Sequence, residues 1–300
     1  MAAPHRTNTA KTPEKVRPSF GLTELLANRK APSLLLADIR GHVLEQARVS
    51  DRDAHVLHPS DICRTDWCPH AAVEKLRGRA VTPQRTSFRR EAVFAYGHDA
   101  HARWQRWLAE MHLLEGTWLC QSRRERFYAR APHACAVCGG QDHLYEELAL
   151  TDPELLIAGR TDGYIPDRAA LVEVKTIGEG TIRHADPALL ARHRVETPRG
   201  VITDFAGLWG AIHRPFTAHL KQGLLYVHLA RVMGLPVERI GFIYDSKMTQ
   251  DAKEFTVSYD KALIRPVLDA ARAVKLAMDG DGPDPPCKAP GACKDCEALI

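Results

Sequence analysis

Apolar and polar positions alternate most clearly in the middle of the chain. Residues 155–160 and 170–176 are short, mostly apolar runs bounded by glycine, proline and aspartate, and they predict two strands joined as a hairpin. Side chains alternate across a strand, so Glu173 and Lys175 share one face while Val174 faces the core. Two charged side chains on an apolar strand are costly to bury without partners, so this strand is a candidate for a polar site.

Helical periodicity dominates on either side of this hairpin. Residues 88–114 place an apolar stripe on one face of a long helix, and that stripe includes His101. Residues 217–233 and 262–278 predict two further helices, and residues 240–259 predict a second hairpin that extends the sheet. We therefore expect an α/β fold in which helices flank a mixed central sheet.

Composition sets the domain organisation. The chain has 300 residues, of which 45% are hydrophobic, enough for a substantial core. The N-terminal residues are rich in Thr, Pro, Lys and Arg, which predicts a disordered basic arm over residues 1–32. A single domain is expected over residues 33–296, and it begins with a helical N-terminal part that includes a Leu-rich helix over 33–46.

Charge does not identify a partner by itself. The net charge of +4 is a small excess of 41 basic over 37 acidic residues. Residues 64–90 are locally basic, with seven Lys or Arg against two acidic residues, and they form either a phosphate-tracking surface or a solvated helix face.

Segments that would direct the chain to a membrane are not evident. There is no apolar run of about 18 residues and no signal-peptide pattern, so we expect neither a membrane span nor export. In the cytoplasmic setting that this predicts, the eight cysteines are more often metal ligands or free thiols than disulfides.

Acidic and basic side chains converge on the first hairpin. Asp162 precedes Glu173 by ten intervening residues, and Lys175 follows on the same face. Two carboxylates and a lysine at one point can form a hard-cation site with an adjacent positive charge. An exposed hairpin with a surface Glu–Lys pair is the alternative. The pair Glu146–Glu147, just upstream, either supports such a site or is an exposed acidic pair.

Two groups of cysteines are candidates for metal binding. Residues 118–145 form a small cysteine-rich insertion, in which Cys135 and Cys138 have the spacing of a zinc knuckle. Arg123 stands where a partner of Cys120 would be expected, so the knuckle is either degenerate or completed by a histidine. The residues of this candidate zinc site are Cys120, Cys135 and Cys138, with His133 or His143 as the fourth ligand.

The order of these residues resembles a known nuclease superfamily. Asp162 and the Glu173-x-Lys175 pair resemble the PD-(D/E)xK signature, and Gln222-x3-Tyr226 resembles the Q-x3-Y motif of its RecB-like branch. Residues 58–70 resemble the N-terminal cysteine motif of that branch, with His70 where arginine is usual. The resemblance is to DNA exonucleases of CRISPR-associated and bacteriophage recombination proteins, and it implies a restriction-endonuclease-like core.

The resemblance also implies roles for individual residues. Lys175 would orient the attacking water and stabilise charge in the transition state, and Gln222 and Tyr226 would position the DNA strand. The ligands of a Mg²⁺ or Mn²⁺ ion would be His101, Asp162, Glu173 and the main-chain carbonyl of Val174.

The C-terminal cysteines resemble the iron–sulfur variant of this branch. There, one early and three late cysteines hold a [4Fe–4S] cluster; the corresponding residues here are Cys68, Cys287, Cys293 and Cys296. The tail spacing is five residues and then two, whereas the branch has two and then five, so zinc is a rival for the same four ligands. Free thiols on the tail are the third alternative.

The resemblance implies a metal-dependent DNA exonuclease, acting in bacteriophage DNA recombination, repair or processing. Its substrate would be single-stranded or duplex DNA ends, in the host cytoplasm if the protein is bacteriophage-encoded. A helicase or a single-strand annealing recombination protein is the expected partner. The alternatives are a structure-specific or restriction-like endonuclease of the same fold and a non-catalytic DNA-binding module.

Overall fold

The computed structural model describes residues 34–47, 53–82 and 86–300. The predicted disordered arm, residues 1–32, lies outside the described residues. The chain divides into two compact units at residue 47. In the first unit, α2 (Leu36–Gln46) confirms the predicted Leu-rich helix. All other elements belong to the second unit.

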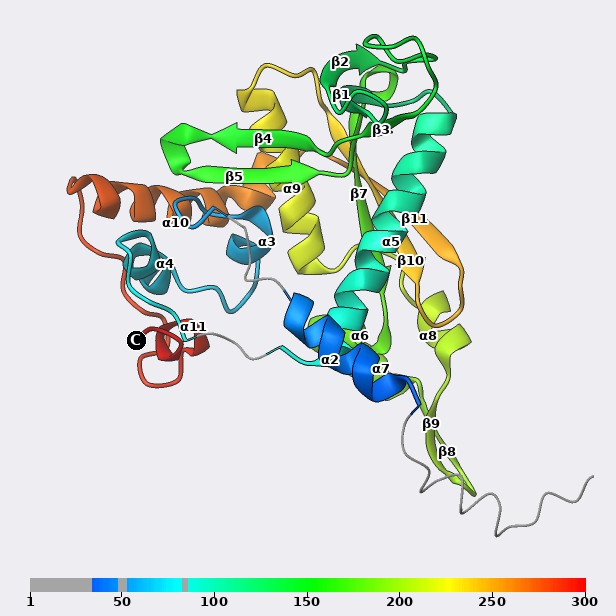
Figure 1. Ribbon diagram of the computed structural model, residues 1–300. Helices are drawn as coiled ribbons and strands as arrows, with labels where there is room; N and C mark the ends of the chain where they lie inside the picture. Colours follow the sequence, from blue (N-terminus) through cyan, green and yellow to red (C-terminus); the bar gives the residue numbers. More distant parts are fainter. Residues whose placement is uncertain (1–33, 48–52, 83–85) are drawn as a thin grey trace, which may run out of the picture. The chain divides into compact units, whose positions relative to one another are not determined.

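A four-stranded sheet forms the centre of the second unit (Figure 1). Its strand order is β11-β10-β7-β6, and the strands are β6 (Gly163–Ile165), β7 (Ala170–Ile177), β10 (Arg239–Ser246) and β11 (Ala252–Ser258). β7 and β10 are parallel, whereas β6 and β11 pair antiparallel to their neighbours. The predicted mixed α/β fold with a mixed sheet is therefore confirmed.

The prediction that residues 155–160 pair with β7 is wrong. The run expected to pair with it forms β5 (Ile157–Thr161), which pairs instead with β4 (Leu148–Asp152) in a separate two-stranded ribbon. The chain bends at Asp162, and β6 then pairs with β7. The bend places the Asp162 carboxylate on the main chain of β7, where it accepts the N–H of Val174 at 2.6 Å.

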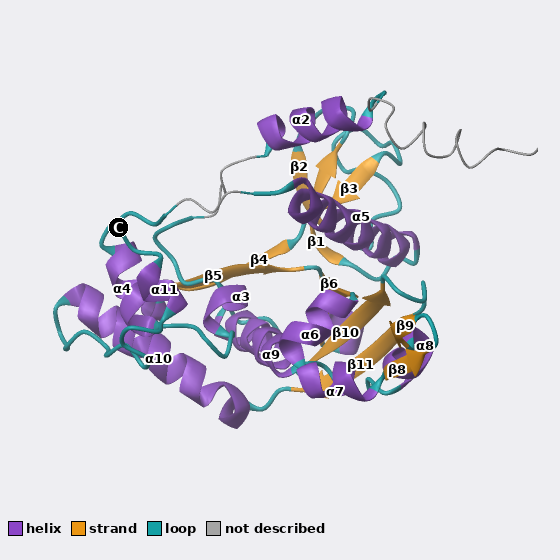
Figure 2. Cartoon of the chain, turned by 90° about the horizontal axis from the view of Figure 1, so that it is seen from below, coloured by secondary structure: helices purple, strands orange, loops and turns teal. Residues whose placement is uncertain are grey.

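Helices α5 (Phe88–Glu110) and α9 (Thr217–Val232) cover opposite faces of β7 (Figures 1 and 2). Val172 belongs to a small apolar cluster against which Leu108 of α5 packs. The next residue, Glu173, points the other way and contacts Gln222 of α9. β7 is thus buried on both faces, as expected of a central strand.

The long helix ends earlier than its periodicity predicts. The side chain of Ser87 caps α5 at its start by accepting the N–H of Arg90 at 3.2 Å. The helix ends at Glu110, and His112 adopts a positive φ of 54°. This turn directs Leu114, which is fully buried, into the cluster around Trp118. Packing of Leu114 explains why the apolar pattern continues beyond the helix.

The remaining elements surround this framework. The segment after β7 carries three short helices and a hairpin. In chain order the remaining elements are α3 (Pro59–Ile62), α4 (Pro69–Leu76), β1 (Glu115–Cys120), β2 (Arg126–Arg130), β3 (His143–Tyr145), α6 (Glu179–Ala185), α7 (Pro187–Arg192), β8 (Arg194–Thr197), β9 (Gly200–Thr203), α8 (Phe205–Gly210), α10 (Lys261–Asp279) and α11 (Lys294–Glu297). Within the described part of the chain, none of the helices has the length and apolarity needed to cross a bilayer.

Close packing of α9 on β10 depends on Gly223. A Cβ added there would lie 2.7 Å from Cε1 of Phe242 and 2.9 Å from Cδ1 of Ile240. We expect Gly223→Ala to lower the free energy of unfolding by about 1–3 kcal/mol, because neither neighbour can move away within a packed core. Urea denaturation followed by circular dichroism measures this change.

Gly180 in α6 provides the matched control, since a Cβ there meets nothing within 4 Å. Gly180→Ala should leave the stability unchanged or raise it by up to about 1 kcal/mol, as helix propensity predicts. Equal stabilities of the two variants would contradict the close approach of α9 to β10.

Candidate active site

Asp162 joins α5 to the sheet. Its Oδ2 accepts the N–H of Val174, and its Oδ1 lies 2.8 Å from Nδ1 of His101. Gln105, one turn after His101, donates to the main-chain oxygen of Asp162 at 3.1 Å. Burial lowers the pKa of His101, but the hydrogen bond and the charge of Asp162, with a contribution from Glu173, raise it above its usual value overall. His101 therefore faces the candidate site, as its stripe predicts.

Glu173 is buried in the core, and one of its two carboxylate oxygens accepts two hydrogen bonds. Its Oε1 accepts from Nζ of Lys175 at 2.7 Å and from Nε2 of Gln222 at 3.1 Å. The Gln222 amide also donates to the hydroxyl of Tyr226 at 3.1 Å. The other oxygen, Oε2, is buried and has no hydrogen-bond partner among the described residues. A buried carboxylate oxygen without a partner is costly, and a bound cation would satisfy it.

The charges of Glu173 and Lys175 depend on each other. Burial raises the pKa of Glu173 to about 7, although the neighbouring Lys175 opposes this shift. Burial lowers the pKa of Lys175, but the attraction and hydrogen bond of Glu173 outweigh burial, so the pKa is raised above its usual value. The Lys175 ammonium is therefore protonated at neutral pH.

Glu147 completes a compact group that the sequence alone could not select. The ligand atoms of His101, Glu147 and Asp162 all lie within 4.8 Å of one another. Burial, followed by the charge of Asp162, raises the pKa of the Glu147 carboxyl. Its neighbour Glu146 instead forms a surface ion pair with Arg126 at 2.7 Å. No pattern in the sequence distinguishes the two glutamates, because only tertiary contacts separate them.

These residues fit a divalent cation. One imidazole and two carboxylates converge in the compact group, and Lys175 contacts the carboxylate of Glu173 beside it. Carboxylate oxygens are the ligands preferred by Mg²⁺, and Mn²⁺ also accepts an imidazole. Val174 contributes its amide to Asp162; the role of its carbonyl as a ligand stays a prediction.

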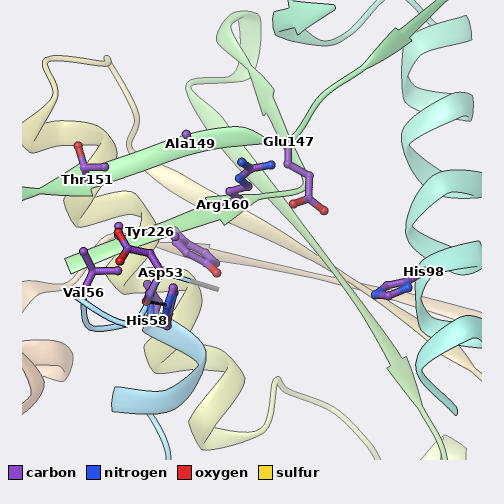
Figure 3. A pocket seen from close by; sticks show the side chains of 12 residues that line it. Asp53, Val56, His58, His98, Glu147, Ala149, Thr151, Arg160 and Tyr226 are labelled. Carbon is purple, nitrogen blue, oxygen red and sulfur yellow. Dashed lines mark hydrogen bonds between the residues drawn. The ribbon is translucent and has the colours of Figure 1, made fainter. Parts of the chain in front are cut away.

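A cavity of ≈ 680 Å³ adjoins this group (Figure 3). Glu147 and Tyr226 line it, so they belong to both the cavity and the candidate site. Arg160 of β5 and His98 of α5 also line it, together with His58 beside α3. Arg160 and His98 belong to no recognisable motif, so the sequence pattern did not predict them as site residues. A cavity of this size with an arginine and an aromatic ring in its wall can accommodate an anionic nucleotide.

The basic stretch over residues 64–90 does not form an open phosphate-binding surface at three of its arginines. Arg64, Arg77 and Arg79 are each engaged in an ion pair. Their partners are Asp295 at 2.9 Å, Asp284 at 2.7 Å and Glu74 at 2.8 Å, respectively. Two of these pairs connect α4 and its neighbouring loops to the C-terminal segment. Residues 83–85 lie outside the described residues.

The cysteine-rich insertion brings three thiols together without a histidine. The sulfurs of Cys120, Cys135 and Cys138 lie within 4.8 Å of one another. The ring of His143 packs against Trp118 instead, with 5.2 Å between centroids, and His133 contacts the ring of His112 at 3.9 Å. His143 nevertheless lies opposite Cys120 in the β1–β3 pair, and its Nδ1 is buried without a hydrogen-bond partner among the described residues, so completion of the site by His143 or His133 stays a prediction. The three cysteines remain a proposed ligand set.

Comparison with known proteins gives structural similarities alone. No family model matches the chain, and no curated protein matches it. The alkaline exonuclease LHK-Exo from Laribacter hongkongensis is 13% identical, with a TM-score of 0.42, over 76% of this chain and 90% of that one. Its complex with dAMP gives 12% identity over the same shares. A putative exonuclease from Eubacterium rectale is 14% identical, with a TM-score of 0.38, over 83% and 92%.

Manganese binding provides a direct measurement of the site. Removing one carboxylate charge with Asp162→Asn should weaken Mn²⁺ binding by about tenfold or more, because that side chain is central to the compact group. Isothermal titration calorimetry measures the affinity. Asp167→Asn is the control, since Asp167 is exposed and pairs with Arg130 outside the site. Equal affinities of the two variants would contradict the assignment.

Proposed function

We propose that this chain is a metal-dependent deoxyribonuclease that hydrolyses phosphodiester bonds at DNA ends. The observation that carries the proposal is the buried Glu173–Lys175 pair, which lies beside Asp162 and leaves one carboxylate oxygen without a partner. The PD-(D/E)xK resemblance uses the same acidic residues and lysine in the same order. Bacteriophage recombination or repair is the setting that this resemblance suggests.

Four side chains would hold the divalent ion. These are His101, Glu147, Asp162 and Glu173, and the ion would supply positive charge that polarises the scissile phosphate. Asp162 is oriented by the Val174 amide, so its carboxylate is positioned before substrate binds. Glu173 lies outside the compact group of three, adjacent to it along β7.

Lys175 would act as a fixed positive charge. Its ammonium is anchored by Glu173, and its raised pKa keeps it protonated, so it cannot take a proton from water. We assign it to orienting the attacking water and to stabilising the negative charge that develops on the phosphate. Gln222 links Glu173 to Tyr226 and thereby holds the wall of the adjoining cavity in place.

The cavity would receive the terminal nucleotides of the DNA strand. Arg160 offers positive charge to the phosphates, His98 offers a ring nitrogen for a hydrogen bond, and Tyr226 offers an aromatic ring near the acidic group. Glu147 lines the cavity and also belongs to the compact group, so an ion held by that group would lie beside a phosphate of the bound DNA.

Loss of the lysine charge tests the catalytic assignment. We expect Lys175→Ala to reduce Mg²⁺- or Mn²⁺-dependent cleavage of end-labelled linear DNA by about 10²–10³-fold, because a fixed donor to the transition state is removed. Circular dichroism checks that the variant is folded. Lys261→Ala, at the exposed start of α10, should retain the activity of the wild-type protein.

Cleavage of linear and of closed circular DNA distinguishes the alternative functions. An exonuclease shortens linear single-stranded or duplex DNA and spares a closed circle, whereas an endonuclease of the same fold also cuts the circle. A Lys175→Ala variant that is as active as the wild type would overturn the assignment. A wild-type protein that binds DNA but does not cleave it would indicate a non-catalytic binding module.

Arg160 provides a test of the DNA path. Arg160→Ala should raise the KM for linear DNA, with little change in kcat, because the side chain contacts phosphate and not the reacting atoms. The slope of log binding constant against log salt concentration should fall by about 1. Arg265→Ala, on the exposed face of α10, is the matched control. An unchanged salt slope for Arg160→Ala would place the strand elsewhere.

A further inference from the structure

The four cysteines at the two ends of the second unit form one compact group. Cys68 lies just before α4, and the other three lie in the C-terminal segment that includes α11. The sulfur of Cys296 is 3.6 Å from that of Cys68 and 3.6 Å from that of Cys287. All four sulfurs, including that of Cys293, lie within 4.8 Å of one another, and all four are free thiols.

This spacing does not fit an iron–sulfur cluster. In a [4Fe–4S] cube each cysteine binds a different iron, so the four protein sulfurs lie outside separate corners with the whole cluster between them. Sulfurs held that way cannot approach to 3.6 Å, as those of Cys68 and Cys296 do. The residues present therefore disagree with the cluster that the family resemblance implies.

A single tetrahedral ion fits the same spacing. Four thiolates at about 2.3 Å from one Zn²⁺ lie about 3.8 Å from each other along the edges of the tetrahedron. We infer that Cys68, Cys287, Cys293 and Cys296 bind one zinc ion in a closed structural site, and not a [4Fe–4S] cluster. This inference is independent of the proposed nuclease activity.

Main-chain amides support the thiolates in the manner of a zinc knuckle. The N–H of Cys296 donates to the sulfur of Cys293, and the N–H of Ala71 donates to that of Cys68. The amide of Cys68 itself donates to Oδ2 of Asp295, which also accepts from Arg64. The Asp295 carboxylate, which lies in the C-terminal segment, thus holds the main chain at Cys68 beside the other three cysteines, as is typical of the groups that surround a structural metal ion.

The site has a structural role because the tail has little apolar anchorage. Cys68, Ala71 and Cys293 form a small buried cluster separate from the main core, with Leu299 partly buried against it. The tail is joined to residues 79–82 by polar contacts, such as the hydrogen bond from the amide of Ile300 to the oxygen of Ala80. An ion that joins residues 228 positions apart would add a cross-link to these contacts.

Metal analysis distinguishes the two kinds of site. Protein is expressed in iron-replete cells and purified without oxygen, and its zinc, iron and acid-labile sulfide are measured. We expect no sulfide, no visible absorption band of an iron–sulfur cluster, and zinc that falls by one equivalent in Cys296→Ala. Cys63→Ala is the control, because Cys63 is buried but belongs to neither cysteine group. Iron and sulfide that disappear with Cys296→Ala would overturn the inference.

Cobalt substitution keeps the test decisive if Cys296→Ala does not fold. Zinc is removed with a chelator from the Cys138→Ala variant, in which the other cysteine group is disabled, and is replaced by Co²⁺. Intense tetrahedral Co²⁺ bands with thiolate charge transfer are expected, and their absence would contradict a four-thiolate site. Zinc removal should also speed hydrogen exchange in residues 287–300 and 68–82, whereas unchanged exchange would show that no ion holds the tail.

Discussion

The burial of Glu173 on β7 is the constraint on which the centre of this protein depends. A carboxylate at 3% exposure in an apolar strand is tolerated only when hydrogen-bond donors reach it, and Oε1 of Glu173 has two such donors, Lys175 and Gln222. Lys175 lies two residues farther along the same strand, so its side chain is on the same face as that of Glu173. Gln222 requires that α9 lie directly over the sheet, and Gly223 beside it allows that close approach. The fold and the candidate site therefore share one packing arrangement.

Asp162 performs a similar function on the side of α5. The bend between β5 and β6 brings its carboxylate to the Val174 amide, while His101 and Gln105 contact it from one face of the helix. Farther along, Asp245 of β10 accepts the indole N–H of Trp104 at 2.8 Å and so fastens the same helix to the next strand. Buried acidic groups with specific partners thus fix the helices, and in fixing them they assemble the ligands of the proposed metal site.

The cysteine groups lie outside this framework and follow a different principle. The C-terminal tail has few buried apolar side chains, so hydrophobic packing alone stabilises it poorly. The insertion between α5 and β4 packs Trp118 against the sheet, but its cysteines lie beyond that cluster. Clustered thiols offer cross-links at both places. The protein thus combines a polar active-site candidate built into the core with clustered thiols, the proposed metal ligands, at its periphery.

The features that depend on local periodicity could be predicted from the residue pattern. Alternation along β7 predicted that Glu173 and Lys175 share a face, the stripe on α5 predicted an inward His101, and one-turn spacing joined Gln222 to Tyr226. Three features became visible in the folded structure alone: which of two adjacent glutamates reaches the site, which strand pairs with β7, and that the ring of His143 packs on Trp118. Periodicity sets the direction of a side chain on its own element, whereas its partner depends on elements distant in the chain. For the same reason, the cysteine spacing suggested a metal, but the distances between sulfurs from the two ends of the unit were needed to choose zinc.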